Sequence, residues 1–295
     1  MLNSKPRDYA RGVLQVPMLG LGAGGLGDEH LDQATIDRLL HRALELGVNL
    51  IDTAPSYGES EVRIGRSIRR QRHQFVLSTK VGYGIPNVED WTGEAVRLGV
   101  DRALERFGTD YIDIVHLHSC PAEVLERGEV PRALIDTVSA GKVRVAAYSG
   151  DGHALYVATG LAGFSGVQAS LSVCDRNNVP TLLSARETGI GTIAKRALAN
   201  APWRYQTEPE REDEAEYWSR WQRLSLDPGA LRPSELVLRW TAHHQAVDCA
   251  LVGTRSIERL ESAVAAVNQG PLPDELALLA DRRWQEVGRA WPPMI

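Results

Sequence analysis

The chain has 295 residues, of which 43% are hydrophobic and 24% charged, so it can bury a sizeable core like an ordinary globular protein. Its net charge of −5 argues against a nucleic-acid-binding surface, and charged residues interrupt every apolar run before it could span a membrane. Cys120, Cys174 and Cys249 stand far apart without a CxxC pair, which argues against a disulfide framework or a zinc site. We therefore expect a cytoplasmic protein without nucleic-acid or membrane partners.

Short apolar runs rich in valine and isoleucine alternate with longer segments of helical period. The runs predict strands over Met18–Gly22, Asn49–Asp52, Phe75–Lys80, Tyr111–His118, Val143–Ser149, Gly166–Ser170, Gly191–Lys195 and Cys249–Gly253. The segments between them predict helices that include Leu31–Leu46, Ser60–Arg70, Thr92–Phe107, Pro131–Ala140, His153–Leu161 and Pro233–His244. Strand and helix in alternation predict parallel strands joined by right-handed crossovers. Eight strands favour an α/β fold of the closed (β/α)8, or TIM barrel, type, with a doubly wound open sheet as the alternative.

A long segment after the seventh strand breaks this alternation. Residues Arg196–Leu231 are too many for an ordinary loop and interleave the aromatic residues Trp203, Tyr205, Tyr217, Trp218 and Trp221. We expect an ordered insertion before the next helix, with a helix of its own from about Glu210 to Leu226. Together with the loop Gly82–Trp91 and the tail that holds Trp291, its aromatic content suggests an apolar or sugar-stacking substrate pocket. An extra helix, Asp274–Gly288, is predicted to close a single domain of residues 1–295.

Four polar residues stand at or just after the ends of successive predicted strands: Asp52, Tyr57, Lys80 and His118. In a barrel, the C-terminal strand ends carry the catalytic groups. Taken alone, each residue has an ordinary structural explanation, such as a turn aromatic or a strand-end cation. Together they suit proton transfer, because a phenol has a pKa near ~10 and a nearby ammonium, held by a carboxylate, favours its ionised form.

The segments around these residues resemble the aldo-keto reductases. The most specific block is Gly47-Val-Asn-Leu-Ile-Asp-Thr-Ala-Pro-Ser-Tyr-Gly-Glu-Ser-Glu, which is similar to the family's first signature. The segment Asp110-Tyr-Ile-Asp-Ile-Val-His-Leu-His-Ser resembles the one that holds its active-site histidine and selects His118 over His116. The resemblance implies a barrel that reduces a small carbonyl compound or oxidises a sugar or alcohol. It also implies that Tyr57 is the general acid, tuned by Lys80 and Asp52, while His118 orients the carbonyl.

The same resemblance implies a nicotinamide site at the barrel mouth. Ser149 and Gln168 match residues that hold the carboxamide, whereas Gly150 stands where the family usually has an asparagine. Gly22 and Lys195, also at strand ends, are assigned to the cofactor site. If the backbone accepts a side chain, we expect Gly150→Asn to tighten cofactor binding.

The segment Leu251-Val-Gly-Thr-Arg-Ser-Ile-Glu-Arg-Leu resembles the family's phosphate-binding turn. Gly253 replaces a common lysine, while Thr254 and Arg259 match the residues that hold the adenosine 2′-phosphate, and Arg255 stands nearby. Ser262 and Ala263 replace a usual Glu-Asn pair beside the adenine. We expect NADP(H) as the cofactor, with NAD(H) as the alternative, and a monomer or small homo-oligomer.

Other functions stay open at this point. His116 and His118 share one strand face, like a metal pair, and suggest a metal-dependent hydrolase, although the other strand ends offer poor ligands. A sensor that binds cofactor with little turnover is a further alternative, with Arg196–Leu231 as its contact surface. The pattern G-x-G-x-x-G at Gly20–Gly25 is weak evidence for a dinucleotide fold, because no helix follows it at once. We expect it to line the substrate site instead.

Overall fold

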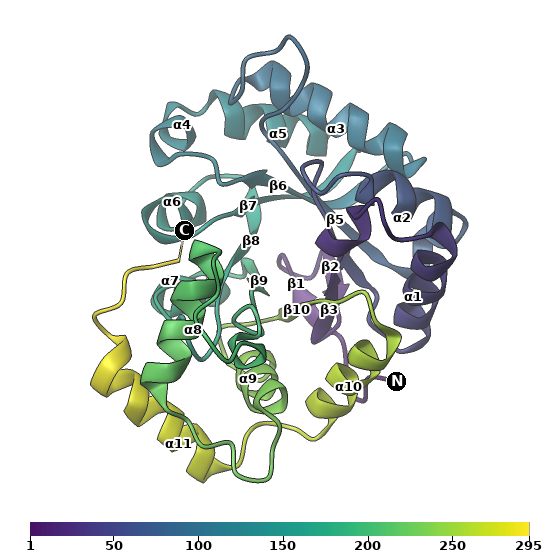
Figure 1. Ribbon diagram of the computed structural model, residues 1–295. Helices are drawn as coiled ribbons and strands as arrows, with labels where there is room; N and C mark the ends of the chain where they lie inside the picture. Colours follow the sequence, from purple (N-terminus) through teal and green to yellow (C-terminus); the bar gives the residue numbers. More distant parts are fainter. Residues whose placement is uncertain (295) are drawn as a thin grey trace.

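The computed structural model describes residues 1–294, so Ile295 of the predicted domain lies outside the described residues. Its centre is a closed barrel of parallel strands in the order β10-β3-β4-β5-β6-β7-β8-β9 (Figure 1). The strands are β3 (Leu19–Gly22), β4 (Leu50–Asp52), β5 (Val76–Val81), β6 (Ile112–His118), β7 (Val143–Ser149), β8 (Phe164–Ser170), β9 (Gly191–Lys195) and β10 (Cys249–Gly253). Each predicted strand agrees with one of these to within two residues at either end. The predicted TIM barrel is confirmed, and the open sheet is wrong.

Helices surround the barrel, as Figure 1 shows. They are α1 (Gln33–Glu45), α2 (Ser60–Ile68), α3 (Gly93–Phe107), α4 (Ala122–Arg127), α5 (Glu129–Ser139), α6 (Gly152–Thr159), α7 (Val179–Glu187), α9 (Pro233–Ala242) and α10 (Ile257–Asn268). Local signals fix their ends: Thr92 caps α3 by accepting from the Ala95 amide, and Gly108, at φ 64°, ends it. Within residues 1–294, no helix has the length and apolarity needed to cross a membrane.

The predicted insertion is ordered and packs against the C-terminal segment. It contains α8 (Glu212–Leu224), which lies beside α11 (Asp274–Arg283) in Figure 1. Arg283 donates to the carbonyls of Arg223 and Leu224 at the end of α8. The predicted last helix continues from α11 into a short π-helical turn, η4 (Trp284–Gly288). These contacts anchor the insertion to the tail of the chain.

The aromatic residues of the insertion pack against one another and against neighbouring groups. Trp203 lies edge-on to Trp221 at 5.6 Å, and Trp218 donates to the carbonyl of Tyr205 at 3.2 Å. Tyr217 is fully buried, with its hydroxyl 3.3 Å from the carboxylate of Asp175. All five rings lie outside the lining of the cavity at the barrel mouth.

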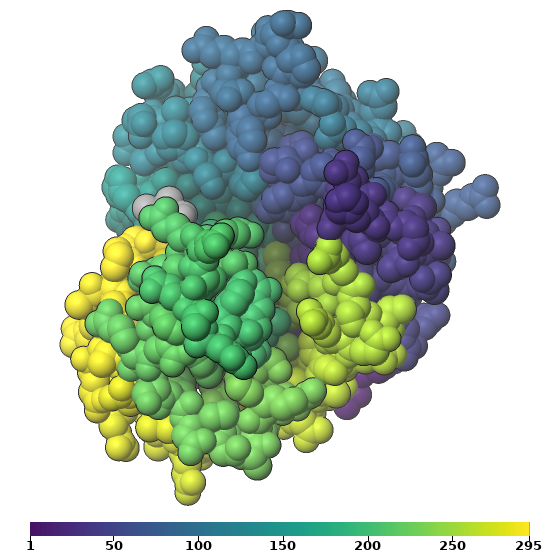
Figure 2. Space-filling view, in the orientation of Figure 1, coloured from purple at the N-terminus to yellow at the C-terminus, as the bar shows by residue number. Residues whose placement is uncertain are grey.

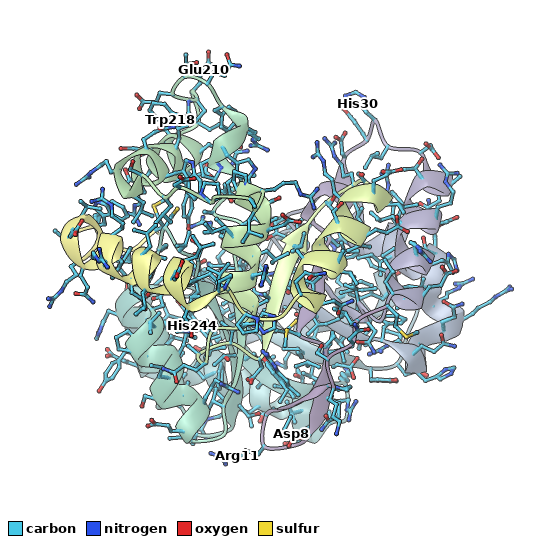
Figure 3. The ribbon with its side chains drawn as sticks, turned by 90° about the horizontal axis from the view of Figure 1, so that it is seen from below. Asp8, Arg11, His30, Glu210, Trp218 and His244 are labelled. Carbon is cyan, nitrogen blue, oxygen red and sulfur yellow. The ribbon has the colours of Figure 1, made fainter. Side chains whose placement is uncertain are left out.

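A short antiparallel hairpin, β1 (Arg7–Tyr9) and β2 (Leu14–Val16), closes the N-terminal end of the barrel and was not predicted. Figure 3 places Asp8 and Arg11 of this hairpin region at the opposite end of the molecule from Glu210 and Trp218 of the insertion. The Tyr9 ring fills the barrel bottom beside two strand glycines. A Cβ atom would lie 2.4 Å from the Tyr9 hydroxyl at Gly166 and 2.2 Å from the ring at Gly191. These glycines therefore make room for the plug.

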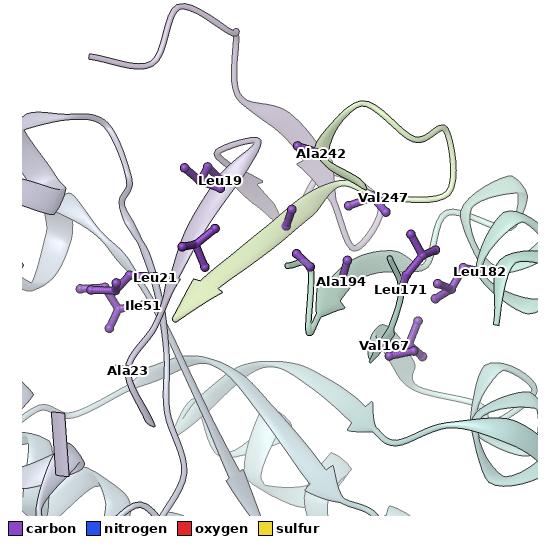
Figure 4. Close-up of a cluster of buried hydrophobic side chains, with 14 of the residues drawn as sticks. Leu19, Leu21, Ala23, Ile51, Val167, Leu171, Leu182, Ala194, Ala242 and Val247 are labelled. Atoms are coloured by element: carbon purple, nitrogen blue, oxygen red, sulfur yellow. The ribbon is translucent and has the colours of Figure 1, made fainter. Parts of the chain in front are cut away.

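The core has two parts, one between barrel and helices and one inside the barrel. Figure 4 shows part of the outer layer, where Leu182 of α7 lies beside Leu171 and Val167. Inside, alternation along each strand sends every second side chain inward. The lower inward positions are apolar, including Leu50, Val76, Ile114, Val145 and Ile193. The upper ones are polar, including Asp52, Ser78, His116, Ser149 and Gln168. The barrel interior is therefore apolar toward the N-terminal ends of its strands and polar toward their C-terminal ends.

Candidate active site

A cavity of about 800 Å³ opens at the C-terminal ends of the barrel strands. Figure 2 shows this face, with the insertion in green and α10 in yellow-green on either side of a hollow near the centre. All the predicted site residues line this cavity: Asp52, Tyr57, Lys80 and His118, with Gly22, Ser149, Gln168, Lys195, Gly253, Thr254, Arg255 and Arg259. A smaller cavity of about 310 Å³, at the hairpin end, is lined by none of them.

A buried ion pair stands at the centre of the cavity floor. The Lys80 ammonium lies 2.8 Å from the Asp52 carboxylate and also donates to the Thr53 carbonyl at 2.7 Å. Ser78 and Gln168 donate to the other carboxylate oxygen at 2.7 and 2.9 Å. Burial by itself would raise the pKa of Asp52, but the Lys80 charge and these hydrogen bonds hold that pKa below its usual range. The pair is therefore ionised, with its cation fixed toward the mouth.

Tyr57 lies over this cation. It follows β4 in a turn closed by its amide and the Ala54 carbonyl, and the Lys80 nitrogen is 5.3 Å from its ring centre. The glycine-rich segment after β3 shapes its surroundings. A Cβ at Gly24 would meet the Tyr57 ring at 3.6 Å, and one at Gly27 would overlap the Tyr57 carbonyl at 1.7 Å. The glycine-rich segment therefore packs against this tyrosine at Gly24 and Gly27, while Gly22, Gly24 and Gly25 line the cavity.

His118 completes the group from the end of β6. Its ring centre is 6.3 Å from that of Tyr57, edge-on. Burial, followed by the Lys80 charge, lowers the pKa of His118 to about 3, so this imidazole is neutral near pH 7. Tyr83, a residue that the sequence analysis missed, places its hydroxyl 2.7 Å from Nδ1 of His118. Its position in the loop, nine residues before the Thr92 cap of α3, gave no motif signal.

His116 lies one inward position deeper and is fully buried. Its Nε2 is 3.0 Å from the Ser78 hydroxyl, and burial lowers its pKa to about 4. Within residues 1–294, no group of three or more His, Cys, Asp or Glu side chains is arranged to hold a metal ion. The hydrolase alternative therefore gains no support from this strand.

Ser149 and Gln168 form a chain of hydrogen bonds that ends at Asp52. The Ser149 hydroxyl donates to the Gln168 side-chain oxygen at 2.9 Å, and the Gln168 amide donates to Asp52. Lys195 is paired with Asp151 at 2.9 Å. Asp151 was missed because it belongs to no motif; its carboxylate also accepts from the Ser170 amide and from Asn178. The charge of Lys195 is thus held at the cavity wall by a buried carboxylate.

The predicted phosphate turn joins β10 to α10. Ser256 caps α10 by accepting from the Arg259 amide, and the start of a helix favours an anion. Arg255 pairs with Asp28, a carboxylate on the loop after β3 that the sequence analysis also missed. The Arg259 guanidinium has no hydrogen-bond partner within residues 1–294 and borders the cavity. Thr254, Arg255 and Arg259 thus offer a hydroxyl and two cations, a donor set that fits the phosphates of a dinucleotide.

The condition set for Gly150→Asn, that the backbone accepts a side chain, is not met. A Cβ atom on Gly150 would lie 2.2 Å from the Tyr148 hydroxyl and 2.6 Å from the ring carbon that carries it. Tyr148 is buried, and its hydroxyl donates to the Cys120 carbonyl at 3.2 Å. A side chain at position 150 would therefore require this buried, hydrogen-bonded ring to shift, which favours glycine there.

Comparison with known proteins agrees with this geometry. The model of the "Aldo/keto reductase family" matches residues 18–280. The chain belongs to the aldo/keto reductase family. The family resemblance predicted from the signature segments is confirmed, and the protein is an oxidoreductase of this family.

Relatives of known activity differ in the cofactor and substrate that they use. L-Galactose dehydrogenase of Arabidopsis thaliana is 28% identical over 280 residues, covering 87% of this chain and 86% of the relative. NADH-specific methylglyoxal reductase of Escherichia coli is 30% identical over 288 residues, covering 84% and 87%. The crystal structure of an aldo/keto reductase from Klebsiella pneumoniae in complex with NADP and acetate superposes with a TM-score of 0.74 at 23% identity, covering 95% of each chain. The family is therefore shown, whereas substrate and cofactor preference are not.

Proposed function

We propose that this aldo/keto reductase uses NADP(H) to reduce a small polar aldehyde or ketone, or to oxidise a sugar or alcohol in reverse, and that Tyr57 exchanges the proton. The observation that carries the proposal is the pairing of a neutral His118 with a Tyr57 that lies over a fixed cation. Two groups at the mouth, the phenol and the imidazole, are close enough to be considered as the acid. Their environments separate their roles.

An imidazole with a pKa of about 3 is charged in roughly one molecule in 10⁴ at pH 7, so His118 is a poor proton donor there. As a neutral ring it still donates a hydrogen bond, which orients and polarises a carbonyl oxygen. Tyr57 then gives its proton to that oxygen. The Lys80 ammonium, held by Asp52 and the Thr53 carbonyl, stabilises the negative charge left on the phenol.

The cofactor assignment is supported by the donor set at the start of α10. Arg259 and Thr254 would hold the 2′-phosphate of NADP(H), while Ser149, Gln168 and Lys195 lie at the nicotinamide end. When bound there, the nicotinamide supplies or accepts the hydride. The NADH-specific relative keeps NAD(H) as the alternative cofactor. Asp28, paired with Arg255, adds a carboxylate near the phosphate site, so Arg259 is the cation on which the preference depends.

The substrate is proposed to be polar because of the rim that the insertion supplies. Asn200, Arg204, Arg211, Asp213 and Glu214 border the cavity, and the aromatic rings of the insertion do not. Relatives named for a sugar and for methylglyoxal act on small, oxygen-rich compounds, which agrees with such a rim. A screen should therefore start with aldoses, sugar lactols and short dicarbonyls. The absorbance of NADPH or NADH would measure turnover of each compound.

The decisive variant is Tyr57→Phe, which keeps the ring and removes the transferable proton. Single-turnover hydride transfer at saturating NADPH should fall by about 10²–10⁴-fold, the usual contribution of a general acid. Tyr156→Phe, on an exposed tyrosine of α6, is the matched control and should keep the parent rate. If the folded Tyr57→Phe variant stays within about threefold of the parent, Tyr57 is not the acid. Tight cofactor binding with no turnover on any carbonyl would favour the sensor alternative.

A further inference from the structure

Tyr83 lies beside His118 in the loop between β5 and α3, outside the cavity lining. Its hydroxyl is 2.7 Å from Nδ1 of His118, and the two rings stack at 5.5 Å with an angle of 25° between their planes. We propose that Tyr83 is a positioning residue whose hydroxyl donates a hydrogen bond to Nδ1 and thereby fixes His118 as the Nε2–H tautomer. The inference rests on the proposed function, in which His118 donates to the substrate.

A neutral imidazole carries a single N–H, and the position of that hydrogen decides what the ring can do. The low pKa of His118 excludes the doubly protonated form near pH 7. With Tyr83 donating to Nδ1, the hydrogen sits on Nε2, which has no protein partner within residues 1–294 and is free for a carbonyl oxygen. With the hydrogen on Nδ1, the Nε2 lone pair would repel that oxygen. Tyr83 therefore decides whether His118 polarises a carbonyl or rejects it.

The loop that carries Tyr83 is shaped to hold this contact. Trp91 packs edge-on against Tyr83 at 5.7 Å, and its amide donates to the Gly82 carbonyl at 2.7 Å. Gly82 has φ +129°, and a Cβ atom there would lie 2.2 Å from the Trp91 ring. Only glycine accommodates both that backbone and the nearby indole. The Gly84 amide is also held by Asp90 at 2.9 Å. Both faces of the contact are thus fixed: His118 stacks on Tyr83, and Trp91 supports it from behind.

The tautomer can be read directly in protein labelled with ¹⁵N-histidine, because protonated and unprotonated ring nitrogens differ widely in chemical shift. A His118→Asn variant identifies the His118 signals. We expect the wild-type protein to show His118 as Nε2–H. Tyr83→Phe, which keeps the stacked ring, should shift His118 toward a mixture of both tautomers. A wild-type signal protonated at Nδ1, or a spectrum unchanged by Tyr83→Phe, overturns the inference. Because the wild-type spectrum alone decides the donor direction, a misfolded variant does not remove the test.

Kinetics provide the second readout. In Tyr83→Phe, kcat with the best carbonyl substrate should fall by about three- to tenfold, as expected for one lost hydrogen bond. The Kd for NADPH should stay unchanged, since Tyr83 lies outside the cavity lining. Tyr83→Leu also removes the stacked ring and should be more severe, whereas Tyr156→Phe should have no effect. An equal loss of kcat and cofactor affinity would indicate general disorder and contradict positioning. Absence of any reductase activity in the wild type would refute the proposed function but leave the tautomer measurement valid.

Discussion

The Asp52–Lys80 pair allows stability and catalysis to be separated with three variants: Lys80→Met, Asp52→Asn and the double variant. Both charges are buried, with side-chain exposures of 6% and 2%. Removing one partner leaves an uncompensated charge in the barrel, which typically costs about 3–5 kcal/mol. In Lys80→Met, the carboxylate keeps the hydrogen bonds from Ser78 and Gln168, so we expect a loss at the lower end of this range, about 3 kcal/mol. Replacing both charges should bring the free energy of unfolding back to within about 1 kcal/mol of the parent.

The pH dependence of the Lys80→Met penalty has a definite sign. In the parent, the pKa of Asp52 is lowered by folding, so its contribution is present above the unfolded pKa of about 3.9 and is lost as pH falls through the folded value. Without Lys80, burial prevails and raises the folded pKa of Asp52. The penalty from burying Asp52 is then absent below pH ~3.9 and grows as pH rises through that raised pKa. Urea unfolding should therefore show a larger penalty relative to the parent at pH 8 than at pH 5.

Catalysis should not recover with stability. At 5.3 Å from the Tyr57 ring and an effective dielectric constant of about 20, the Lys80 charge stabilises a phenolate by about 3 kcal/mol, or about two powers of ten in rate. Single-turnover hydride transfer should thus fall about 100-fold in Lys80→Met and equally in the double variant. Asp52→Asn should be milder, because the ammonium stays near the phenol. A double variant with parental stability and a parental rate would refute the role given to Lys80.

Two further predictions concern the cofactor site. Gly150→Asn should destabilise the fold by about 1–3 kcal/mol, the usual cost of overpacking, because its side chain would overlap Tyr148. The matched variant Gly160→Asn, at an exposed glycine with φ −91° whose Cβ would meet nothing nearer than 3.5 Å, controls for the loss of a glycine. Equal urea midpoints for Gly150→Asn and the parent would contradict the packing argument. Arg259→Ala should lower kcat/KM for NADPH by about tenfold or more, since a charge-assisted hydrogen bond contributes about 1.5–3 kcal/mol. The same variant should leave kcat/KM for NADH nearly unchanged. A preference for NADH in the parent, or no change with NADPH, would refute the 2′-phosphate assignment.

The barrel was predictable because its strands are buried on both faces and therefore read as short, continuous apolar runs. The β1–β2 hairpin was not, since three-residue strands leave no period to detect. The sequence signal for this hairpin lies in two of the barrel strands. Gly166 and Gly191 are the first residues of two predicted strands, and a glycine in a strand can mark a close approach by another group. That group is Tyr9, which is more than 150 residues away in sequence.

The residues of the candidate site were likewise predictable only in part. Asp52, Lys80 and His118 were predictable because strand ends converge in a barrel. Tyr83, Asp151 and Asp28 were missed because each acts as a partner to another side chain. Pairing of this kind depends on loop geometry, which leaves no spacing rule in the sequence. The aromatic residues of the insertion are conspicuous in the sequence, but their spacing did not show that Trp203 packs on Trp221 or that Trp218 donates to the Tyr205 carbonyl.

The surroundings of Tyr57 and His118 account for the different roles proposed for these two neutral groups at the cavity mouth. Tyr57 and His118 face the same cation, Lys80, and its charge acts on them in opposite senses. A positive neighbour stabilises a phenol that has lost its proton, whereas it opposes an imidazole that gains one. In the proposed mechanism, this ammonium favours proton donation by Tyr57, while burial, followed by the same charge, lowers the pKa of His118 and keeps that ring neutral near pH 7. The proposed hydrogen bond from Tyr83 then decides which nitrogen of the neutral ring carries its hydrogen. The proposed direction of proton transfer therefore depends on where Lys80 is held, and Asp52 and the Thr53 carbonyl hold it.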